Sequence, residues 1–401
     1  MKNIREKALE LHKQYKGKLS VNVKVPVENA NDLSLVYSPG VAEPCKEIYE
    51  DPDKIYDYTI KGNLVAVISD GSAVLGLGNI GAGASMPVME GKAALFKGFA
   101  DIDAIPLCIN THDPEQIIQT VKLLEPTFGG INLEDISAPN CFIIEERLKK
   151  EMNIPVFHDD QHGTAIVTAA GLINALKIVD KRLDNTKVVI NGAGAAGIAT
   201  TKLLLNMGVH DIILCDSKGA IYEGRQYGMN AMKESISKYT NKNKVEGLLQ
   251  EVIKDTDVFI GLSVAEAVTP QMVQSMNRDP IIFAMANPIP EIMPAVALAA
   301  GAAVVGTGRS DMANQVNNVL AFPGIFKGAL EVFASEINEE MKLAAVFAIA
   351  NLITRKELKH DYVIPRAFDE RVADAVARAV AEAAIKTGVA RKKMVKQEKI
   401  I

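Results

Sequence analysis

The chain has 401 residues, of which 48% are hydrophobic and 23% are charged, and its formal net charge is −5. This composition fits a globular enzyme of two domains, and the negative charge argues against general binding to nucleic acid. The charged N-terminus lacks the apolar core of a signal peptide, no apolar stretch is long enough to span a bilayer, and the four cysteines form no Cys-x-x-Cys pair. We therefore expect a cytoplasmic protein with free thiols.

Short apolar runs alternate with helical segments in the first 160 residues. An amphipathic helix is expected over residues 2–16, and Tyr37-Ser-Pro-Gly reads as a turn before another helix. We expect strands at residues 64–69, 104–109 and 130–133, and helices at residues 89–99, 114–124 and 138–149. This alternation predicts a parallel α/β arrangement.

The same alternation starts again at Thr164. Helices are expected at residues 164–176 and 198–207, strands at residues 187–190, 211–215, 258–261 and 281–286, and helical structure from Asn318 to the end. The fold class is therefore α/β, in three parts. We expect an N-terminal α/β substrate and metal domain (1–160), a Rossmann-type dinucleotide-binding domain (161–317) and a helical C-terminal segment (318–401) that packs back on both.

Two pairs of adjacent carboxylates each follow a short apolar run. They are Glu134-Asp135 and Asp159-Asp160. Each pair is expected where a strand ends and a loop begins, which is where α/β folds place their chemistry. Adjacent carboxylates repel one another, and a bound cation relieves that repulsion. Several carboxylate oxygens suit Mg²⁺ or Mn²⁺ better than zinc.

The second pair lies within His158-Asp-Asp-Gln-His162, which has the histidine spacing of a zinc-protease helix. That function requires both histidines on one helix. Here Pro155-Val-Phe precedes them as a strand and Gly163 follows at once. The sequence therefore argues against a zinc site of this kind.

Two segments fit the Gly-x-Gly-x-x-Gly pattern of dinucleotide-binding turns. In the second one a β-branched strand leads into Gly192, Gly194, Ala195, Ala196 and Gly197, and a helix follows. We expect these residues to bind the dinucleotide. The first segment, residues 76–81, runs into further glycines and Pro87, and we expect a loop that lines the substrate cleft.

Asp216 lies 19 residues beyond Gly197 at the end of the next strand, where a carboxylate binds the adenosine ribose hydroxyls. This position favours NAD over NADP, because a 2′-phosphate would meet a like charge. Lys218 weakens the preference, since its side chain can pair with that phosphate.

Several single residues are candidates for catalysis or substrate binding. Lys92 follows Glu90-Gly91 in a helix of small and apolar residues, and burial would lower its pKa toward that of a general base. A lysine that reaches out to solvent explains the same pattern. Tyr37 precedes a turn where a phenol can face a cleft, and the asparagines Asn287, Asn317 and Asn318 can bind carboxylates or a carboxamide, or simply form turns.

These motifs, in this order, resemble those of the malic enzymes, most closely the short bacterial form. The matching segments are Tyr37-Ser-Pro-Gly-Val-Ala, Leu75-Gly-Leu-Gly-Asn-Ile-Gly, Gly91-Lys92, Asn132-Leu-Glu-Asp-Ile, Phe157-His-Asp-Asp-Gln-His-Gly-Thr-Ala, Gly192-Ala-Gly-Ala-Ala-Gly, Ala286-Asn-Pro and Asn317-Asn-Val-Leu-Ala-Phe-Pro-Gly. The match runs over nearly the whole chain. Eight motifs in one order are far more specific than any one of them.

The resemblance implies oxidative decarboxylation of L-malate to pyruvate and CO₂, with reduction of NAD or NADP and with Mg²⁺ or Mn²⁺ as cofactor. By that similarity Glu134, Asp135 and Asp160 are the metal ligands. Lys92 matches the general base that takes the proton of the malate hydroxyl, and Tyr37 matches the general acid that protonates the enolate at C3.

Asp159 matches an active-site carboxylate beside the metal ligands, and Asn287 and Asn317 match amides that contact the substrate, with Asn318 next to them. One departure is clear. Larger malic enzymes carry a carboxylate-binding arginine shortly before the Gly-Leu-Gly motif, and this chain has Ala73 in the matching stretch. Backbone amides of the glycine loop and the asparagines are the expected substitutes.

Two other functions remain open from the residues alone. One is a different two-domain NAD-dependent dehydrogenase, for example one acting on amino acids, and the other is a dinucleotide-binding regulator without catalysis. The carboxylate pairs argue against the first, and the presence of Tyr37 and Lys92 argues against the second. We further expect a homodimer that binds neither nucleic acid nor membrane.

Overall fold

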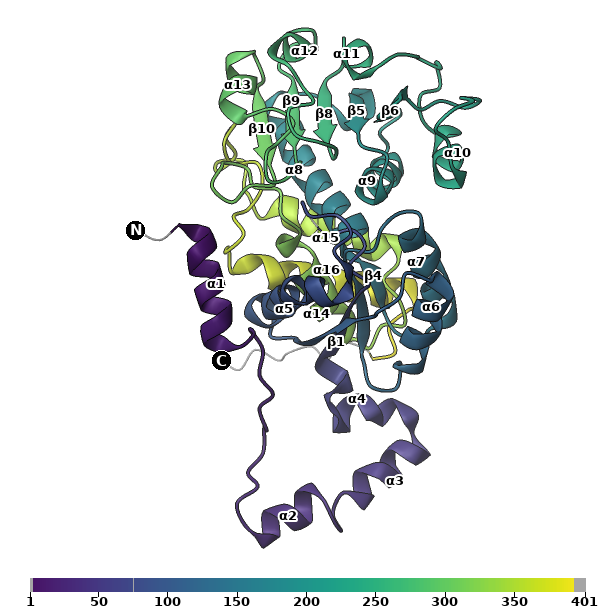
Figure 1. Cartoon of the computed structure of the whole chain (residues 1–401), viewed down its shortest axis with the longest axis vertical. Helices are drawn as coiled ribbons and strands as arrows, with labels where there is room; N and C mark the ends of the chain where they lie inside the picture. The colour runs from purple at the N-terminus through teal and green to yellow at the C-terminus, as the bar shows by residue number, and fades with distance from the viewer. Residues whose placement is uncertain (1–2, 75, 393–401) are drawn as a thin grey trace.

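The computed structural model describes residues 3–74 and 76–392. Two largely parallel sheets lie in separate lobes, and a layer of helices joins them (Figure 1). The predicted α/β fold class is confirmed. Within the described residues, no helix is both long enough and apolar enough to cross a lipid bilayer.

The first sheet forms the lower lobe in Figure 1 and carries the carboxylate pairs at its strand ends. Its strands are β1 (Leu64–Ser69), β2 (Asp103–Cys108), β3 (Gly130–Leu133) and β4 (Val156–His158), and its helices are α5 (Gly81–Ala100), α6 (Pro114–Leu123) and α7 (Asn140–Glu151). The strand order is β2-β1-β3-β4, and all pairs are parallel. β3 and β4 are therefore neighbours whose carboxyl ends meet.

The second sheet has the strand order β10-β9-β8-β5-β6-β7, and within it only β7 is antiparallel. Its strands are β5 (Lys187–Asn191), β6 (Asp211–Asp216), β7 (Gly219–Ala220), β8 (Val258–Gly261), β9 (Ile281–Ala284) and β10 (Val304–Thr307). Its helices are α9 (Ala195–Asn206), α10 (Ala231–Ser237), α11 (Leu249–Val252), α12 (Pro270–Gln274) and α13 (Pro294–Ala299). The chain leaves β5 toward β6 on one side and reaches β8 on the other, which creates the crevice where such sheets bind nucleotides.

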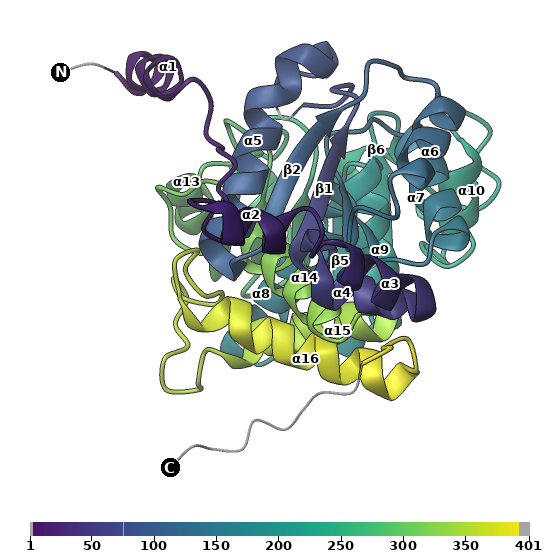
Figure 2. The same cartoon turned by 90° about the horizontal axis from the view of Figure 1, so that it is seen from below.

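A helical layer connects the two sheets. It consists of α8 (Thr164–Ile178), α14 (Phe322–Glu331), α15 (Glu339–Asn351) and α16 (Arg371–Thr387). α16 packs on α14 and α15, which in turn contact α5 and α8 (Figure 2). Alternate residues of β1 face different cores: Val65 and Val67 join the core shared with this layer, whereas Ala66 and Ile68 face the helices of the first sheet alone.

The N-terminal segment is an arm that extends away from the rest of the chain (Figure 1). Its elements are α1 (Ile4–Tyr15), α2 (Ala30–Val36), α3 (Ala42–Glu50), α4 (Ile55–Tyr58) and the 3₁₀ turns η1 (Pro52–Lys54) and η2 (Ile60–Asn63). The helices α1 to α4 contain no buried residue. The arm is thus not held by a core of its own.

Three expectations from the sequence were wrong. The chain is not helical throughout after Asn318, because residues 352–370 between α15 and α16 are irregular. The helix expected from Met89 begins earlier, since α5 starts at Gly81 and contains Pro87. Its small buried residues Ala82 and Ser85 let the helix pack closely on β2, and this packing overrides weak helix propensity. β10 was missed, because its apolar residues continue directly from the alanine-rich helix α13.

Four phenylalanines anchor the helical layer to the first sheet. Phe96 of α5 lies with its ring centroid 4.7 Å from that of Phe322 and 5.3 Å from that of Phe326, and Phe157 of β4 lies 5.9 Å from Phe326. All four side chains are fully buried. The rings therefore fix α14 against β4, the strand that leads into Asp159 and Asp160.

Replacing Phe326 with Ala should lower the free energy of unfolding by about 3–5 kcal/mol, because it leaves a cavity at this junction. Urea unfolding followed by circular dichroism measures the change. Phe347→Ala is the matched control, because Phe347 is 48% exposed on α15 and should cost less than about 1 kcal/mol. Equal losses in both variants would contradict the anchoring role.

Candidate active site

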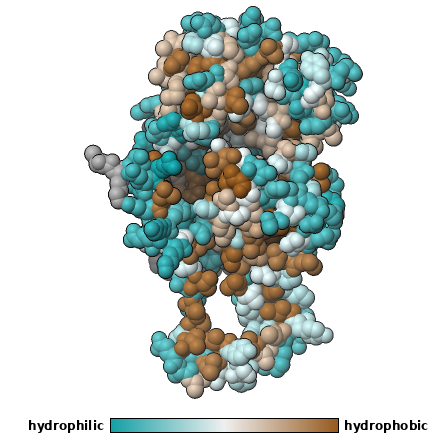
Figure 3. Space-filling model, viewed as in Figure 1, coloured by the Kyte–Doolittle hydropathy of each residue, from teal (hydrophilic) through white to brown (hydrophobic). Residues whose placement is uncertain are grey.

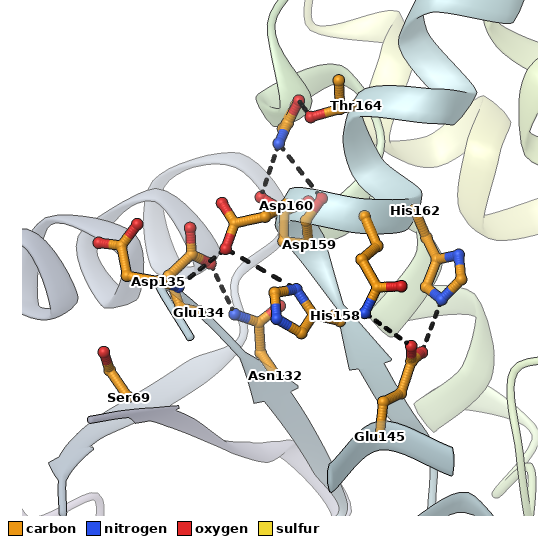
Figure 4. Close-up of polar contacts among 12 residues, drawn as sticks. Ser69, Asn132, Glu134, Asp135, Glu145, His158, Asp159, Asp160, His162 and Thr164 are labelled. Carbon is orange, nitrogen blue, oxygen red and sulfur yellow. Dashed lines mark hydrogen bonds and ion pairs between the residues drawn. The ribbon is translucent and has the colours of Figure 1, made fainter. Parts of the chain in front are cut away.

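The two carboxylate pairs meet because β3 and β4 are adjacent and in register. Leu133 lies opposite His158, so Glu134-Asp135 and Asp159-Asp160 follow at the same edge of the sheet. Both pairs sit at strand ends, as the sequence predicts (Figure 4).

Glu134, Asp135 and Asp160 each place a carboxylate oxygen within 4.8 Å of the other two. Glu134 and Asp135 are buried, while the side chain of Asp160 is 35% exposed. Burial and the charges of Asp160, Asp159 and Asp135 raise the pKa of Glu134 well above its usual value, in spite of nearby Lys92. A divalent cation among these oxygens would offset that repulsion, so the donor set fits Mg²⁺ or Mn²⁺.

Two backbone features hold these side chains in place. Asp135 has a φ of 53°, in the left-handed region that is uncommon for a residue with a side chain. Its backbone N–H donates to Asp160 Oδ2 at 2.8 Å, which ties the two pairs together. Asn132 Nδ2 donates to Glu134 Oε2 at 3.0 Å. Asn132 was not identified from the sequence as a residue that orients Glu134. A polar residue within an apolar strand could have indicated such a role.

A short π-helical turn, η3 (Asp159–Gly163), follows β4. Such turns are rare and are frequently found at functional sites. A Cβ on Gly163 would lie 1.9 Å from Asp159 Oδ1, so only glycine fits at this position. Asn318 fixes the turn from inside, because its Nδ2 donates to Asp159 O at 3.3 Å and to Asp159 Oδ2 at 3.2 Å.

Lys92 reaches this cluster from α5. Its Nζ lies 2.6 Å from Asp159 Oδ2 and 3.0 Å from Glu134 Oε1, and 4.5 Å from the ring centroid of Phe322. The side chain is 12% exposed, so Lys92 does not extend into solvent. Burial favours the neutral amine, but Asp159 and Glu134 outweigh it and raise the pKa. The expected lowering of this pKa was therefore wrong, because the sequence did not reveal both partners.

The predicted dinucleotide turn has the required geometry. β5 ends at Asn191, Gly192 has a φ of 120°, and α9 begins at Ala195 without a side-chain cap. A Cβ on Gly192 or Gly197 would lie 2.2 Å or 1.7 Å from a backbone oxygen, whereas Gly194 has no atom within 4 Å of its Cβ position. The open face at Gly194 and the helix N-terminus suit a pyrophosphate.

The nucleotide turn lies close to the carboxylates. α9 packs against the π-helical turn, and Ala195 packs on the core of the first sheet. The other glycine segment, residues 76–81, is not a tight turn between a strand and a helix, because β1 ends at Ser69 and α5 begins only at Gly81. It lies instead near the Ala-Asn-Pro segment: a Cβ on Gly76 would be 3.9 Å from Asn287 O.

Asp216 ends β6 and is already surrounded by donors. Arg225 donates to both of its oxygens, Lys233 Nζ lies 2.6 Å from Oδ2, and the backbone N–H of Lys218 lies 2.9 Å from Oδ1. Burial opposes the charged carboxylate, but Arg225 and Lys233 outweigh it and lower its pKa to about 2. Both cations were missed, since Arg225 lies in an irregular segment 9 residues after Asp216 and Lys233 lies on α10, 17 residues after it.

Within one chain, Tyr37, Asn287 and Asn317 make no hydrogen bond to the carboxylate cluster or to Lys92 among the described residues. Tyr37 caps α2 in the projecting arm, its side chain is exposed, and none of its polar contacts reaches a described residue of the cluster. Asn317 accepts from Val319 N at 3.0 Å, and Asn287 donates to Met285 O at 3.3 Å.

The two histidines do not form a zinc site. His158 is fully buried with its Nδ1 3.7 Å from Asp160 Oδ2, while His162 points away and contacts Glu145. Within the described ranges, Glu134, Asp135 and Asp160 are the only group of three or more such ligands close enough to share a metal ion.

Comparison with known proteins agrees with this geometry. The family model "Malic enzyme, N-terminal domain" matches residues 16–116 and 110–149, and "Malic enzyme, NAD binding domain" matches residues 161–385. The chain is 69% identical over 389 residues to the bifunctional malic/malolactic enzyme of Bacillus subtilis, covering 97% of this chain and 95% of that protein. It is 58% identical to the NAD-dependent malic enzyme of Geobacillus stearothermophilus, covering 94% and 78%.

Among solved structures, the malic enzyme of Pyrococcus horikoshii superposes with a TM-score of 0.94 at 49% identity, covering 98% of this chain and 93% of that one. Both halves of the chain, with their cluster of carboxylates and their nucleotide turn, match one family. The chain therefore belongs to the malic enzyme family.

Proposed function

We propose that this site performs the malic enzyme reaction: oxidation of L-malate at C2 by NAD or NADP, followed by loss of CO₂ to give pyruvate. The observation that carries the proposal is the meeting of three carboxylates, a buried lysine and a dinucleotide turn at one place. An amino-acid dehydrogenase or a non-catalytic regulator gives no role to the carboxylate cluster.

We infer that Glu134, Asp135 and Asp160 hold Mg²⁺ or Mn²⁺. When bound, such an ion supplies Lewis-acid polarisation of substrate oxygens. The short spacing of the carboxylates and the raised pKa of Glu134 support this inference. Asn132 and the backbone N–H of Asp135 orient two of the ligands.

Lys92 is proposed to accept the proton of the C2 hydroxyl at Nζ while the C2 hydride passes to the nicotinamide. A cation held by Glu134, Asp135 and Asp160 would offset the charges of these carboxylates, which would lower the pKa of Lys92 toward that of a general base. Asp159 holds Nζ in place, and Asn318 holds Asp159.

Substrate carboxylates are proposed to be bound by amides. Ala73 offers no charged side chain, and its backbone N–H already donates to Asp135 O at 3.0 Å. Asn287 lies beside the glycine segment at Gly76, which supports a shared role for the two. Asn317, next to Asn318, completes the set of proposed substrate contacts.

Tyr37 is proposed to protonate C3 of the enolate in the active site of a second copy. The arm that carries Tyr37 exposes many large apolar side chains (Figure 3). Val21 is 95% exposed, Tyr49 is 90% exposed and Tyr37 itself is 68% exposed. An arm of this kind is stabilised when a second chain covers it, and exchanged segments are a common basis of dimers. We therefore propose a homodimer that completes each site with the arm of the other chain.

Either dinucleotide is proposed to bind. The four contacts to Asp216 from Lys218, Arg225 and Lys233 fill its acceptor positions, and two of the donors are cations. The sequence favoured NAD because the charge of Asp216 would repel the 2′-phosphate of NADP. In the structure that repulsion is offset, because a 2′-phosphate beside Asp216 would also meet the ammonium group of Lys233.

The three-part division at residues 160 and 317 and a cytoplasmic location also remain proposals. All strands of the first sheet lie before residue 160 and those of the second between residues 187 and 307, which supports the division. All four cysteines are free thiols, which suits a reducing compartment.

Mn²⁺ should raise the melting temperature of the metal-free protein, and the increase should grow with pH. The pKa of Glu134 in the folded state lies above that in the unfolded state, so between the two values the folded state binds more protons and loses stability as pH rises. A cation replaces the proton in that range. Asp160→Ala should abolish the increase while NAD binding persists, and the exposed Asp184→Ala is the control. A normal Mn²⁺ response in Asp160→Ala would refute the ligand set.

L-malate with NAD or NADP and Mn²⁺ should give the reduced dinucleotide and pyruvate, measured by absorbance at the reduced nicotinamide. Lys92→Ala and Tyr37→Phe should each lose activity by roughly 10²-fold or more. Hybrid dimers of the two variants should regain activity, because one of their two sites then has an intact Lys92 and receives an intact Tyr37. Hybrids without recovery would show that Tyr37 does not act between chains.

Lys233→Met should lower kcat/KM for NADP by about tenfold and leave that for NAD within about twofold, because it removes one charge-assisted contact to the 2′-phosphate. Steady-state kinetics at saturating malate measure both values. Lys238→Met is the control, since Lys238 is exposed and follows the same helix α10. An equal loss for both dinucleotides would contradict the proposed contact.

A further inference from the structure

The π-helical turn has a second polar face directed away from the carboxylate cluster. Gln161 Nε2 donates to Glu145 Oε2 at 3.0 Å, and His162 Nε2 lies 2.6 Å from Glu145 Oε1. Figure 4 shows His162 and Glu145 on the opposite side of the end of β4 from Glu134 and Asp135. Glu145 comes from α7 and is 6% exposed.

A lysine from the helical layer completes this network. Lys342 of α15 is 3% exposed, and its Nζ lies 3.2 Å from His162 Nδ1 and 2.7 Å from Glu339 Oε1. An ammonium group has only donors, so Nδ1 accepts and the proton of His162 is on Nε2, which donates to Glu145. Every polar atom of the His162 ring therefore has a partner, and the direction of each bond is fixed.

The side-chain network supports the outer side of the π-helical turn. A cavity of about 390 Å³ lies on this side of the turn, and its lining includes Gln161, His162, Glu145 and Lys342. The hydrogen bonds of Gln161 and His162 to Glu145 and Lys342 cross a space that is not close-packed, so they limit movement of the turn toward it. On the inner side Asn318 holds Asp159, and the backbone N–H of Asp135 holds Asp160 Oδ2, so the contacts of Gln161 and His162 add a second support from the outer side.

We propose that Glu145 is a positioning residue: through Gln161 and His162 it fixes the π-helical turn, and so sets the affinity of Asp160 and its neighbours for the divalent cation. Glu145 itself touches neither the cluster nor Lys92. This inference rests on the proposed function, because it assumes that the carboxylates bind a metal. It assigns a role in the site to α7 and α15, which carry none of the proposed ligands.

The test is the dissociation constant of Mn²⁺, measured by electron paramagnetic resonance of the free ion well below the melting temperature. In Glu145→Gln the new side-chain NH₂ group faces either Gln161 Nε2 or His162 Nε2, which are both donors, so one of the two hydrogen bonds to residue 145 is lost. We expect the dissociation constant to rise by about 10- to 100-fold, the usual effect of removing a support behind a metal ligand. The KM for malate should rise with it.

Glu146→Gln is the matched control, because Glu146 is the next residue on α7 but is exposed and pairs with Lys150 on the surface. Its Mn²⁺ affinity should equal that of the parent protein. Gln161→Leu, which removes one donor to Glu145 and leaves Glu145 charged, is the second variant and should weaken Mn²⁺ binding in the same direction.

The variant Asp160→Ala distinguishes failure of the proposed metal site from failure of the positioning role of Glu145. If Asp160→Ala loses Mn²⁺ binding while Glu145→Gln and Gln161→Leu bind Mn²⁺ as the parent does, the positioning role is overturned and the metal site stands. If these variants only lower the melting temperature, Glu145 is a structural residue and the inference is again wrong. If Asp160→Ala binds Mn²⁺ normally, the proposed metal site itself fails.

Discussion

The structure depends on four carboxyl groups brought together at the ends of two neighbouring strands. The register of β3 and β4 puts Glu134, Asp135, Asp159 and Asp160 in one place, and the ammonium group of Lys92 contacts Glu134 and Asp159 directly. Burying several like charges is costly unless cations offset them. The position of α5, which delivers Lys92, and the proposed binding of a divalent cation both offset this repulsion.

The rest of the fold keeps that cluster beside the nucleotide turn. The helical layer packs on both sheets, and its rings at Phe322 and Phe326 fix α14 against α5 and β4. α9, which begins at the nucleotide turn, packs on the same π-helical turn that carries two of the carboxylates. Hydride transfer needs the C2 atom and the nicotinamide held within reach of one another, and this shared contact provides the frame for it.

The sequence predicted most of what local pattern controls. The strand ends, the glycine turn at Gly192 and the α/β fold class all depend on short-range apolar runs and turn residues, and the structure agrees with them. It did not predict features that arise from contacts between distant segments. The raised pKa of Lys92 needs Asp159, 67 residues away, and Lys342 lies 180 residues from its partner His162. Glu145 lies in a helix rich in charged residues, where no local pattern marks it as buried, and Tyr37 lies outside the carboxylate cluster of its own chain because the arm extends outward.

We expect Glu134, Asp135 and Asp160 to bind one divalent cation, which anomalous X-ray scattering from crystals grown with Mn²⁺ can locate. One strong anomalous peak per chain should appear at about 2.1 Å from a carboxylate oxygen of each of these three residues. A peak at any other group of side chains, or crystals saturated with Mn²⁺ that show no peak between these carboxylates, would contradict this expectation.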